Sequence, residues 1–220
     1  MRLQDELDAL RGKCYENTPS HIRRVRQEAI DDLVSAGIAE RAIQAGNQAP
    51  GFRLIDPDGR MISSHDLLND GPVLIAFYRG GWCPYCNLDL RAIQAVAQRL
   101  RSSGVSIVAI SQQSAYESRA TERMNGLSFS SLVDRGGGVA RAFGVRWKLP
   151  RELRATEMET GLDLAAVNGE PSWTLTMPAR FLVSRDGIVE YADISADYTR
   201  RGDPAELFPV IMQIRARVAH

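Results

Sequence analysis

The chain has 220 residues, with 27 Lys and Arg balanced by 27 Asp and Glu, so its formal net charge at pH 7 is zero. A neutral chain lacks the surplus of cations that binds phosphate backbones, which argues against nucleic acid as the main ligand. Hydrophobic residues make up 44% and charged residues 25%, a balance that is typical of globular proteins and excludes a disordered chain.

The sequence contains no stretch of about 18 apolar residues, so we expect no membrane span. Its charged start, MRLQDELDAL, also lacks the apolar segment of a secretory signal. Both features predict a cytoplasmic protein, and structural disulfides are rare in that compartment.

Residues 1–45 show helical patterns throughout and no strand pattern. Leu3, Leu7, Leu10 and Cys14 recur at spacings of four, three and four, which places them on one face of a helix. A second apolar stripe precedes Gly37 and consists of Ile22, Val25, Ala29, Ile30, Leu33 and Val34. Helices of this length are marginal in water when isolated. We therefore expect an N-terminal helical extension that packs on the core or on a second subunit, which leaves a homodimer open.

From residue 46 onward, strand and helix patterns alternate, which is typical of an α/β sheet with helices on its faces. The expected strands are Phe52–Ile55, Val73–Tyr78, Val105–Ser111, Ser130–Val133, Ala179–Ser184 and Ile188–Ala192. The expected helices are Pro84–Ser102, Ala115–Asn125, Gly138–Phe143 and Pro204–Arg217. Residues 147–176 fit neither period, and we interpret them as an insertion in a domain that spans 46–220.

The strongest chemical signal is a C-x-x-C motif where a strand meets a helix. The apolar run VLIAFY ends shortly before Gly80 and Gly81, and a helical pattern follows Cys83, Pro84 and Cys86. Unpaired backbone N–H groups at a helix start stabilise negative charge and lower a thiol pKa. A spacing of three residues also lets two sulfurs meet across one helical turn. The pattern therefore favours a redox-active pair that can close a disulfide.

Two other readings of the cysteine pair remain open. Small residues at a helix start can simply be buried. Zinc would need two further ligands, and the three histidines, His21, His65 and His220, are scattered and unpaired. We expect neither a metal nor another bound cofactor.

Two motifs resemble the peroxiredoxins of the alkyl hydroperoxide reductase/thiol-specific antioxidant type. The segment GNQAPGFRL at 46–54 is similar to their opening, approximately G-x-x-A-P-x-F-x-L, and the strand, WCPYC at 82–86 and helix resemble the thioredoxin fold. The resemblance covers about residues 46–200. It implies a thioredoxin-like fold with a central mixed sheet flanked by helices. In this family, the cysteine that attacks peroxide lies nine residues after the first aromatic residue of the strand that precedes it. Counting nine residues from Phe77 reaches Cys86.

The chain departs from the family pattern at the residues that polarise a peroxide. The family motif around this cysteine is P-x-x-x-T-x-x-C. With Cys86 at its final position, the resemblance places Arg79 at the proline position and Cys83 at the threonine position. The family also uses an arginine far along the chain to polarise the peroxide. The corresponding position in this sequence is Pro178, and the arginine nearest to that position is Arg180. Met177-Pro178 resembles the cis-proline loop of thioredoxin-like reductases, which faces the cysteine pair and receives substrate. The resemblance thus implies substrate-binding roles for Pro178 and Arg180.

Other residues have two readings each. Arg79 either stabilises a thiolate or peroxide oxygen or ends its strand in solvent. Trp82 either contacts substrate or fills the core. Cys14 is expected to be a buried apolar residue, the alternative being a resolving thiol. We expect Arg200 and Arg201 to lie on a solvated face.

The resemblance implies a thiol oxidoreductase that reduces hydroperoxides or protein disulfides through catalytic Cys83 and Cys86. Thioredoxin, glutaredoxin or glutathione would then supply electrons. A redox sensor without turnover and a non-catalytic member of the fold are the alternatives. Access and helix position favour Cys83 as the attacking thiol in disulfide exchange, whereas the peroxiredoxin register favours Cys86. Oxidation is expected to join these two cysteines and leave Cys14 free.

Overall fold

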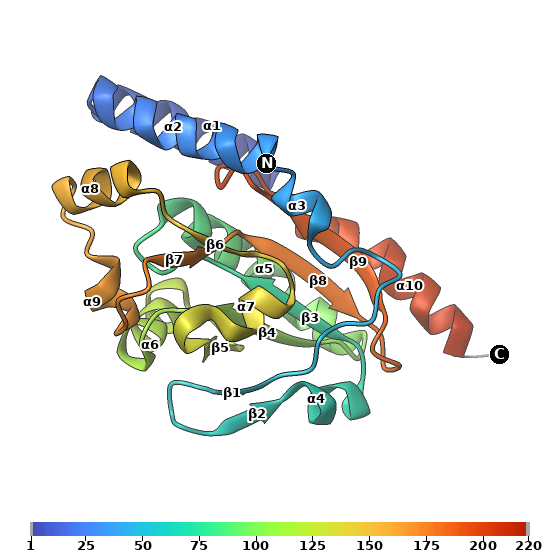
Figure 1. The fold of residues 1–220 in the computed structure, drawn as a ribbon. Helices are drawn as coiled ribbons and strands as arrows, with labels where there is room; N and C mark the ends of the chain where they lie inside the picture. The colour runs from blue at the N-terminus through green and yellow to red at the C-terminus, as the bar shows by residue number, and fades with distance from the viewer. Residues whose placement is uncertain (1, 219–220) are drawn as a thin grey trace.

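A computed structural model describes residues 2–218 and shows a mixed seven-stranded sheet with helices on both faces (Figure 1). The strand order is β2-β1-β5-β4-β3-β8-β9, and a separate two-stranded sheet pairs β6 with β7. The strands are β1 Arg53–Ile55, β2 Met61–Ser63, β3 Val73–Phe77, β4 Ser106–Ser111, β5 Ser130–Val133, β6 Arg146–Lys148, β7 Thr174–Thr176, β8 Ala179–Val183 and β9 Val189–Ile194. The α-helices are α1 Leu3–Asn17, α2 Ser20–Ser35, α3 Ile38–Arg41, α4 Ser64–Asp70, α5 Pro84–Ser102, α6 Ala115–Asn125, α7 Gly138–Ala142, α8 Arg151–Glu159, α9 Leu164–Asn168 and α10 Leu207–Val218. Short 3₁₀ helices span Arg135–Gly137 and Pro204–Glu206.

Strand β3 lies inside the sheet, between β4 and β8, and carries the site at its carboxyl end. It runs parallel to β4 and antiparallel to β8, and all five of its side chains are buried. An unbroken apolar run suits a strand that is covered on both faces. Alternate residues point to opposite sides, so Leu74 and Ala76 join one core cluster while Val73, Ile75 and Phe77 join the other.

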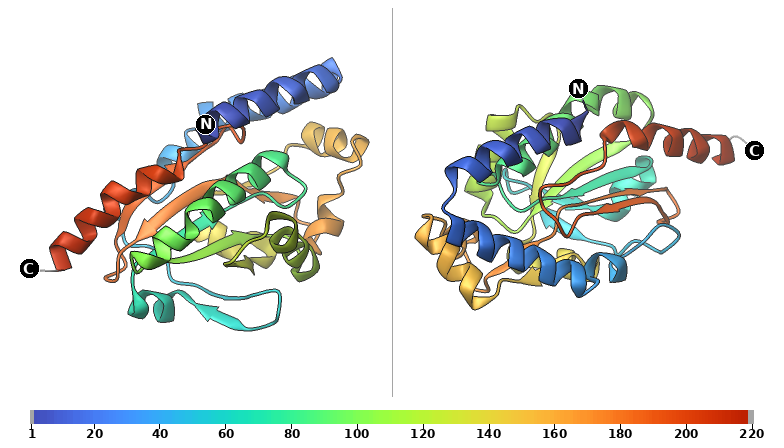
Figure 2. Two further views of the ribbon diagram at one scale, coloured as in Figure 1. Left: turned by 180° about the vertical axis from the view of Figure 1, so that it is seen from behind. Right: turned by 90° about the horizontal axis from the view of Figure 1, so that it is seen from above.

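The N-terminal helices pack against their own chain. Helix α1 contacts α5 and α2 contacts α8, and Figure 2 shows α1 and α2 diverging from their short connection. Leu3 and Leu7 of α1 are buried in the cluster that includes α5. Ala29 of α2 packs with Leu149 and Leu153 at the start of the inserted segment. The chain itself therefore covers much of the apolar stripes of this hairpin, whereas Val34 at the end of α2 stays 54% exposed.

Residues 147–176, which fit neither period in the sequence, contain regular elements in the structure. Strands β6 and β7 have three residues each, and helices α8 and α9 have nine and five. Elements this short do not complete enough periods to be recognised in sequence. The hairpin strand β2 and the helix α4 escaped the sequence prediction for the same reason.

The other expected elements are present with small shifts at their ends. Helix α5, helix α6 and strand β5 have the expected bounds, and the third N-terminal helix is only four residues long. Within residues 2–218, no helix combines the length and the apolar character that crossing a membrane requires.

Candidate active site

The site forms where β3 gives way to α5. Cys83 is the N-cap residue of α5 and Pro84 begins the helix, a position at which proline's missing N–H would have had no partner. The chain approaches α6 closely here: a Cβ on Gly81 would lie 2.2 Å from Thr121 Oγ1. Glycine at 81 is therefore required for the turn that presents Cys83.

The two thiols of the motif differ in environment. Both are buried and all three cysteines of the chain are free. Burial alone would raise the pKa of Cys83, but a hydrogen bond from Cys86 and the positive charge of Arg79 outweigh it and lower the pKa to about 6. Burial and the neighbouring Cys83 sulfur raise the pKa of Cys86 well above its usual range. At neutral pH the arrangement therefore provides one thiolate, on Cys83, and one protonated thiol, on Cys86.

Arg79 is buried beside Cys83 and does not end its strand in solvent. Its residue is 6% exposed, and its guanidinium carbon lies 4.7 Å from the ring centre of Trp82 and 4.1 Å from that of Tyr198. Its Nε has no hydrogen-bond partner among the described residues. A buried cation without a carboxylate partner stabilises nearby negative charge strongly. Arg79 is thus placed to favour the Cys83 thiolate and any anion that approaches it.

Replacing Arg79 with methionine should raise the pH at which Cys83 becomes reactive. Arg79→Met removes the charge while keeping an apolar stem between the two rings, and losing a cation at this range moves a thiol pKa upward by about one unit. Because the thiolate is the reactive form, the midpoint of the pH profile for iodoacetamide alkylation should rise by that amount. The measurement is made in a Cys14→Ser background. The control is Arg79→Lys, which keeps the positive charge and should hold the midpoint near the wild-type value. A midpoint that stays in place in Arg79→Met would contradict this account.

Arg180, for which the resemblance implied a substrate-binding role, is not among the residues that line the cavity described below. It is buried, forms an ion pair with Asp89 of α5, and donates from Nη1 to Gly202 O at 2.8 Å. These two contacts tie Arg180 to α5 and to the loop after β9, while its buried Nε has no hydrogen-bond partner among the described residues.

Arg201, expected on a solvated face, is also buried and contacts the site. Its Nε donates to Asp89 Oδ2 at 3.2 Å, and its Nη2 lies 3.7 Å from Cys86 Sγ. The loop after β9 folds back over α5 and carries this side chain inward. No local pattern in the sequence marks Arg201, because Cys86 lies 115 residues away.

Pro178 follows a trans peptide bond, so the expectation of a cis-proline loop was wrong. Only Met177 and Pro178 separate β7 from β8, and Met177 N donates to Val145 O at 2.7 Å while Ser195 N donates to Pro178 O at 3.0 Å. The chain thus runs extended between two paired strands, as residues before a proline prefer. Pro178 lines a small cavity that adjoins the cysteine site and shares Arg79 and Tyr198 with it.

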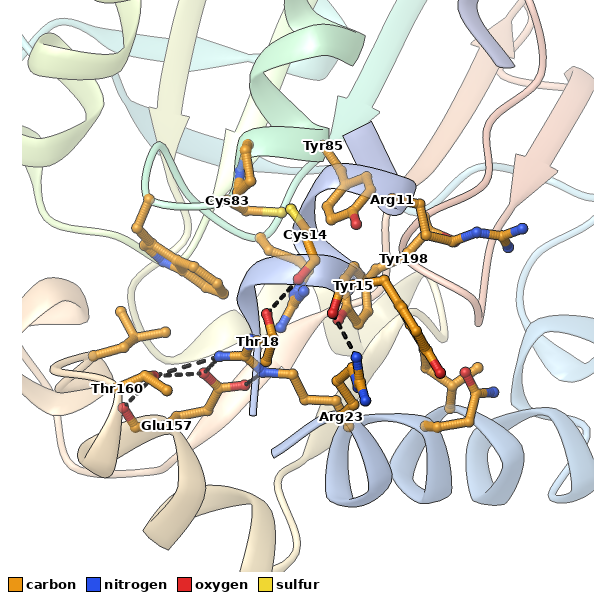
Figure 3. Close-up of a pocket in the computed structure, with 18 of the residues that line it drawn as sticks. Arg11, Cys14, Tyr15, Thr18, Arg23, Cys83, Tyr85, Glu157, Thr160 and Tyr198 are labelled. Atoms are coloured by element: carbon orange, nitrogen blue, oxygen red, sulfur yellow. Dashed lines mark hydrogen bonds and ion pairs between the residues drawn. The ribbon is translucent and has the colours of Figure 1, made fainter. Parts of the chain in front are cut away.

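A cavity of about 520 Å³ opens onto Cys83 between α1, α2, α5 and α8 (Figure 3). Cys86 is not among the residues that line it, whereas half-buried Cys14 and Trp82 are. Trp82 thus lines the cavity and also packs against the core. The lining residues are Arg11, Cys14, Tyr15, Thr18, Arg23, Arg26, Gln27, Ile30, Arg79, Trp82, Cys83, Pro84, Tyr85, Glu157, Thr160, Gly161, Leu162, Asp197, Tyr198 and Thr199.

Comparison with solved structures shows a shared fold. Peroxidoxin BcpB from Mycobacterium tuberculosis superposes with a TM-score of 0.61 at 20% identity, covering 79% of this chain and 97% of that chain. AhpC of Enterococcus faecalis superposes with a TM-score of 0.60 at 21% identity, covering 80% and 95%. Both matches support a thioredoxin-like fold.

Sequence comparison shows the family. The thiol-disulfide oxidoreductase ResA of Halalkalibacterium halodurans is 32% identical over 122 residues, which are 54% of this chain and 67% of the relative. The chloroplastic peroxiredoxin Q of Oryza sativa subsp. japonica is 28% identical over 103 residues, about half of each chain. The model of the AhpC/TSA family matches residues 45–192, a stretch that includes both cysteines of the motif. The chain therefore belongs to the AhpC/TSA family and is a peroxiredoxin-like, thiol-dependent oxidoreductase.

Proposed function

We propose that this protein reduces hydroperoxides with Cys83 as the attacking thiolate and Cys86 as the resolving thiol. The observation that carries the proposal is the asymmetry of the pair: Cys83 has a lowered pKa beside Arg79 and faces the cavity, while Cys86 stays protonated behind it. This assignment favours Cys83 over the cysteine that the peroxiredoxin register selects.

The proposed cycle has three steps. The Cys83 thiolate attacks the outer peroxide oxygen, the O–O bond breaks, and an alkoxide leaves and takes a proton from water. The Cys86 thiol then attacks the sulfur of the Cys83 sulfenic acid, forming a disulfide and releasing water. Two equivalents of an external thiol reopen the disulfide and leave as their own disulfide. Arg79 stabilises the negative charge on sulfur and on the departing oxygen.

A direct test is to mix the reduced protein with one equivalent of hydrogen peroxide. Loss of two mass units in the whole protein and a Cys83–Cys86 peptide would support the cycle. With excess dithiothreitol, the protein should consume peroxide over many turnovers, and Cys14→Ser should do the same. A Cys14 link in the oxidised protein, or peroxide consumption no faster than the thiol alone, would refute the proposal.

Thiol–disulfide exchange is the second candidate, because the similarity to ResA and the C-x-x-C motif both favour it. The same thiolate would then attack a substrate disulfide. If the protein reduces insulin disulfides faster than it reduces hydrogen peroxide, thiol–disulfide exchange is the function selected. Either activity requires a thiol donor such as thioredoxin, glutaredoxin or glutathione, and three cysteines without a disulfide framework suit a reducing compartment such as the cytoplasm.

A further inference from the structure

We propose that the cavity beneath the N-terminal hairpin binds a small, carboxylate-bearing thiol of about tripeptide size, which reduces the oxidised cysteine pair. The inference rests on the proposed function and names the class of reductant. Three observations carry it: how Cys83 is covered, the charge of the cavity wall, and the size of the cavity.

Access to Cys83 is restricted by the hairpin. The residue is 1% exposed and lies beneath α1 and α2. Helix α1 is held by Leu3 and Leu7 in the core, and α2 is held to α8 by Arg26, which donates to both carboxylate oxygens of Glu157 at 3.1 and 2.7 Å. An incoming sulfur must come within about 2 Å of Cys83 Sγ to form a disulfide. A folded protein reductant cannot do this without displacing the hairpin, whereas a small thiol enters through the cavity.

The wall of the cavity carries more positive than negative charge. Four arginines line it, and the two carboxylates are Glu157 and Asp197. Glu157 is bound by Arg26, while Asp197 accepts from the backbone and hydroxyl of Thr199 and pairs with Arg200. The arginines are Arg11, Arg23, Arg26 and Arg79.

Among the described residues, three of these arginines therefore have no close carboxylate partner, unlike Arg26. Arg79 has its buried, unpartnered Nε at the sulfur end. Arg23 stacks on the ring of Tyr15 and donates from Nη1 to Tyr15 O at 2.6 Å, which leaves its other N–H groups for a ligand, and Arg11 has a long, exposed contact of 3.8 Å to Asp8. In Figure 3, Arg23 lies below Cys83, and the side chain of Arg11 is directed to the right, away from Cys83. A ligand that spans the cavity would place its sulfur at Cys83 and its carboxylates near these two arginines.

The size of the cavity indicates a ligand larger than hydrogen peroxide. A volume of about 520 Å³ falls within the range of small-molecule pockets and greatly exceeds what hydrogen peroxide needs. Aromatic side chains also line the cavity, namely Tyr15, Trp82, Tyr85 and Tyr198. They provide the apolar walls that a peptide-like thiol contacts.

The reduction step balances with the groups present. The thiolate of the ligand attacks Cys83 Sγ of the Cys83–Cys86 disulfide, the S–S bond breaks, and the electron pair goes to Cys86, which takes up a proton. Arg201 faces the sulfur that receives this charge, with Nη2 3.7 Å away. A second ligand thiolate then attacks the ligand sulfur of the mixed disulfide, which releases the Cys83 thiolate and the oxidised ligand.

The test compares two thiols as reductants of the pre-oxidised protein. Glutathione carries two carboxylates and 2-mercaptoethanol carries none. In Arg11→Gln/Arg23→Gln, the ratio of the second-order rate constants, glutathione over mercaptoethanol, should fall about tenfold because charge-assisted contacts are lost. Arg11→Lys/Arg23→Lys should recover most of the ratio. Arg24→Gln is the matched control: its side chain pairs with Glu28 and does not line the cavity, so the ratio should stay within twofold.

A binding measurement separates recognition from chemistry. S-methylglutathione cannot reduce a disulfide, and calorimetry should detect its binding to the wild-type chain and about tenfold weaker binding to Arg11→Gln/Arg23→Gln. An unchanged ratio together with undetectable binding would overturn the inference, as would reduction by thioredoxin faster than by glutathione. In either case mercaptoethanol-driven peroxide turnover would leave the proposed function standing. Absence of turnover with every thiol would instead refute the proposed function.

Discussion

Cys83→Ser is expected to reduce peroxide turnover by about a thousandfold or more, since it removes the nucleophile on which all later steps depend. A serine hydroxyl does not ionise near neutral pH, so Arg79 and the start of α5 cannot activate it. The measurement is peroxide consumption under excess dithiothreitol. Because Cys83 and serine are nearly the same size, the variant should keep the fold, which a thermal melt checks.

Cys86→Ser should behave differently from Cys83→Ser. The lone Cys83 still attacks, but no neighbouring thiol resolves the product, so mass spectrometry should show a stable sulfenic acid or a mixed disulfide with the added thiol. Cys14→Ser serves as the control with both redox thiols intact. If Cys83→Ser instead forms the sulfenic acid on Cys86 and reacts faster with peroxide, the two roles are reversed.

Asp89→Asn is expected to destabilise the fold by about 3–5 kcal/mol, the typical cost of removing one partner from a buried charge network. Asp89 is 3% exposed and neutralises two buried guanidinium groups, those of Arg180 and Arg201. An amide leaves both cations without a counter-charge in a medium that solvates them poorly. The loss should appear as a lower midpoint in urea unfolding with an unchanged slope.

A matched control for Asp89→Asn is Asp66→Asn on α4. The Asp66 side chain is 79% exposed, and exposed charge pairs contribute about 0–1 kcal/mol. The same change of one oxygen to nitrogen should therefore leave the unfolding midpoint almost in place. If both variants unfold alike, the Asp89 network does not stabilise the chain.

The sequence by itself was sufficient to identify the central elements and the redox motif. Helix α5 and strand β5 follow from apolar runs and from glycine and proline signals that act within a few residues. The family resemblance likewise comes from contiguous segments, GNQAPGFRL and WCPYC. A helix start stabilises a thiolate wherever it occurs in a fold, so a lowered thiol pKa at this position could be expected without knowledge of long-range contacts.

The tertiary structure decided which other side chains meet that pair. Asp89 is separated from Arg180 by 91 residues and from Arg201 by 112, so local patterns cannot show that two of the arginines are buried rather than solvated. The hairpin of α1 and α2 could have covered a second subunit equally well, since an apolar stripe does not specify its partner surface. Only the folded chain places Cys14 beside the same cavity as Cys83, because packing, and not periodicity, determines where an amphipathic helix lies.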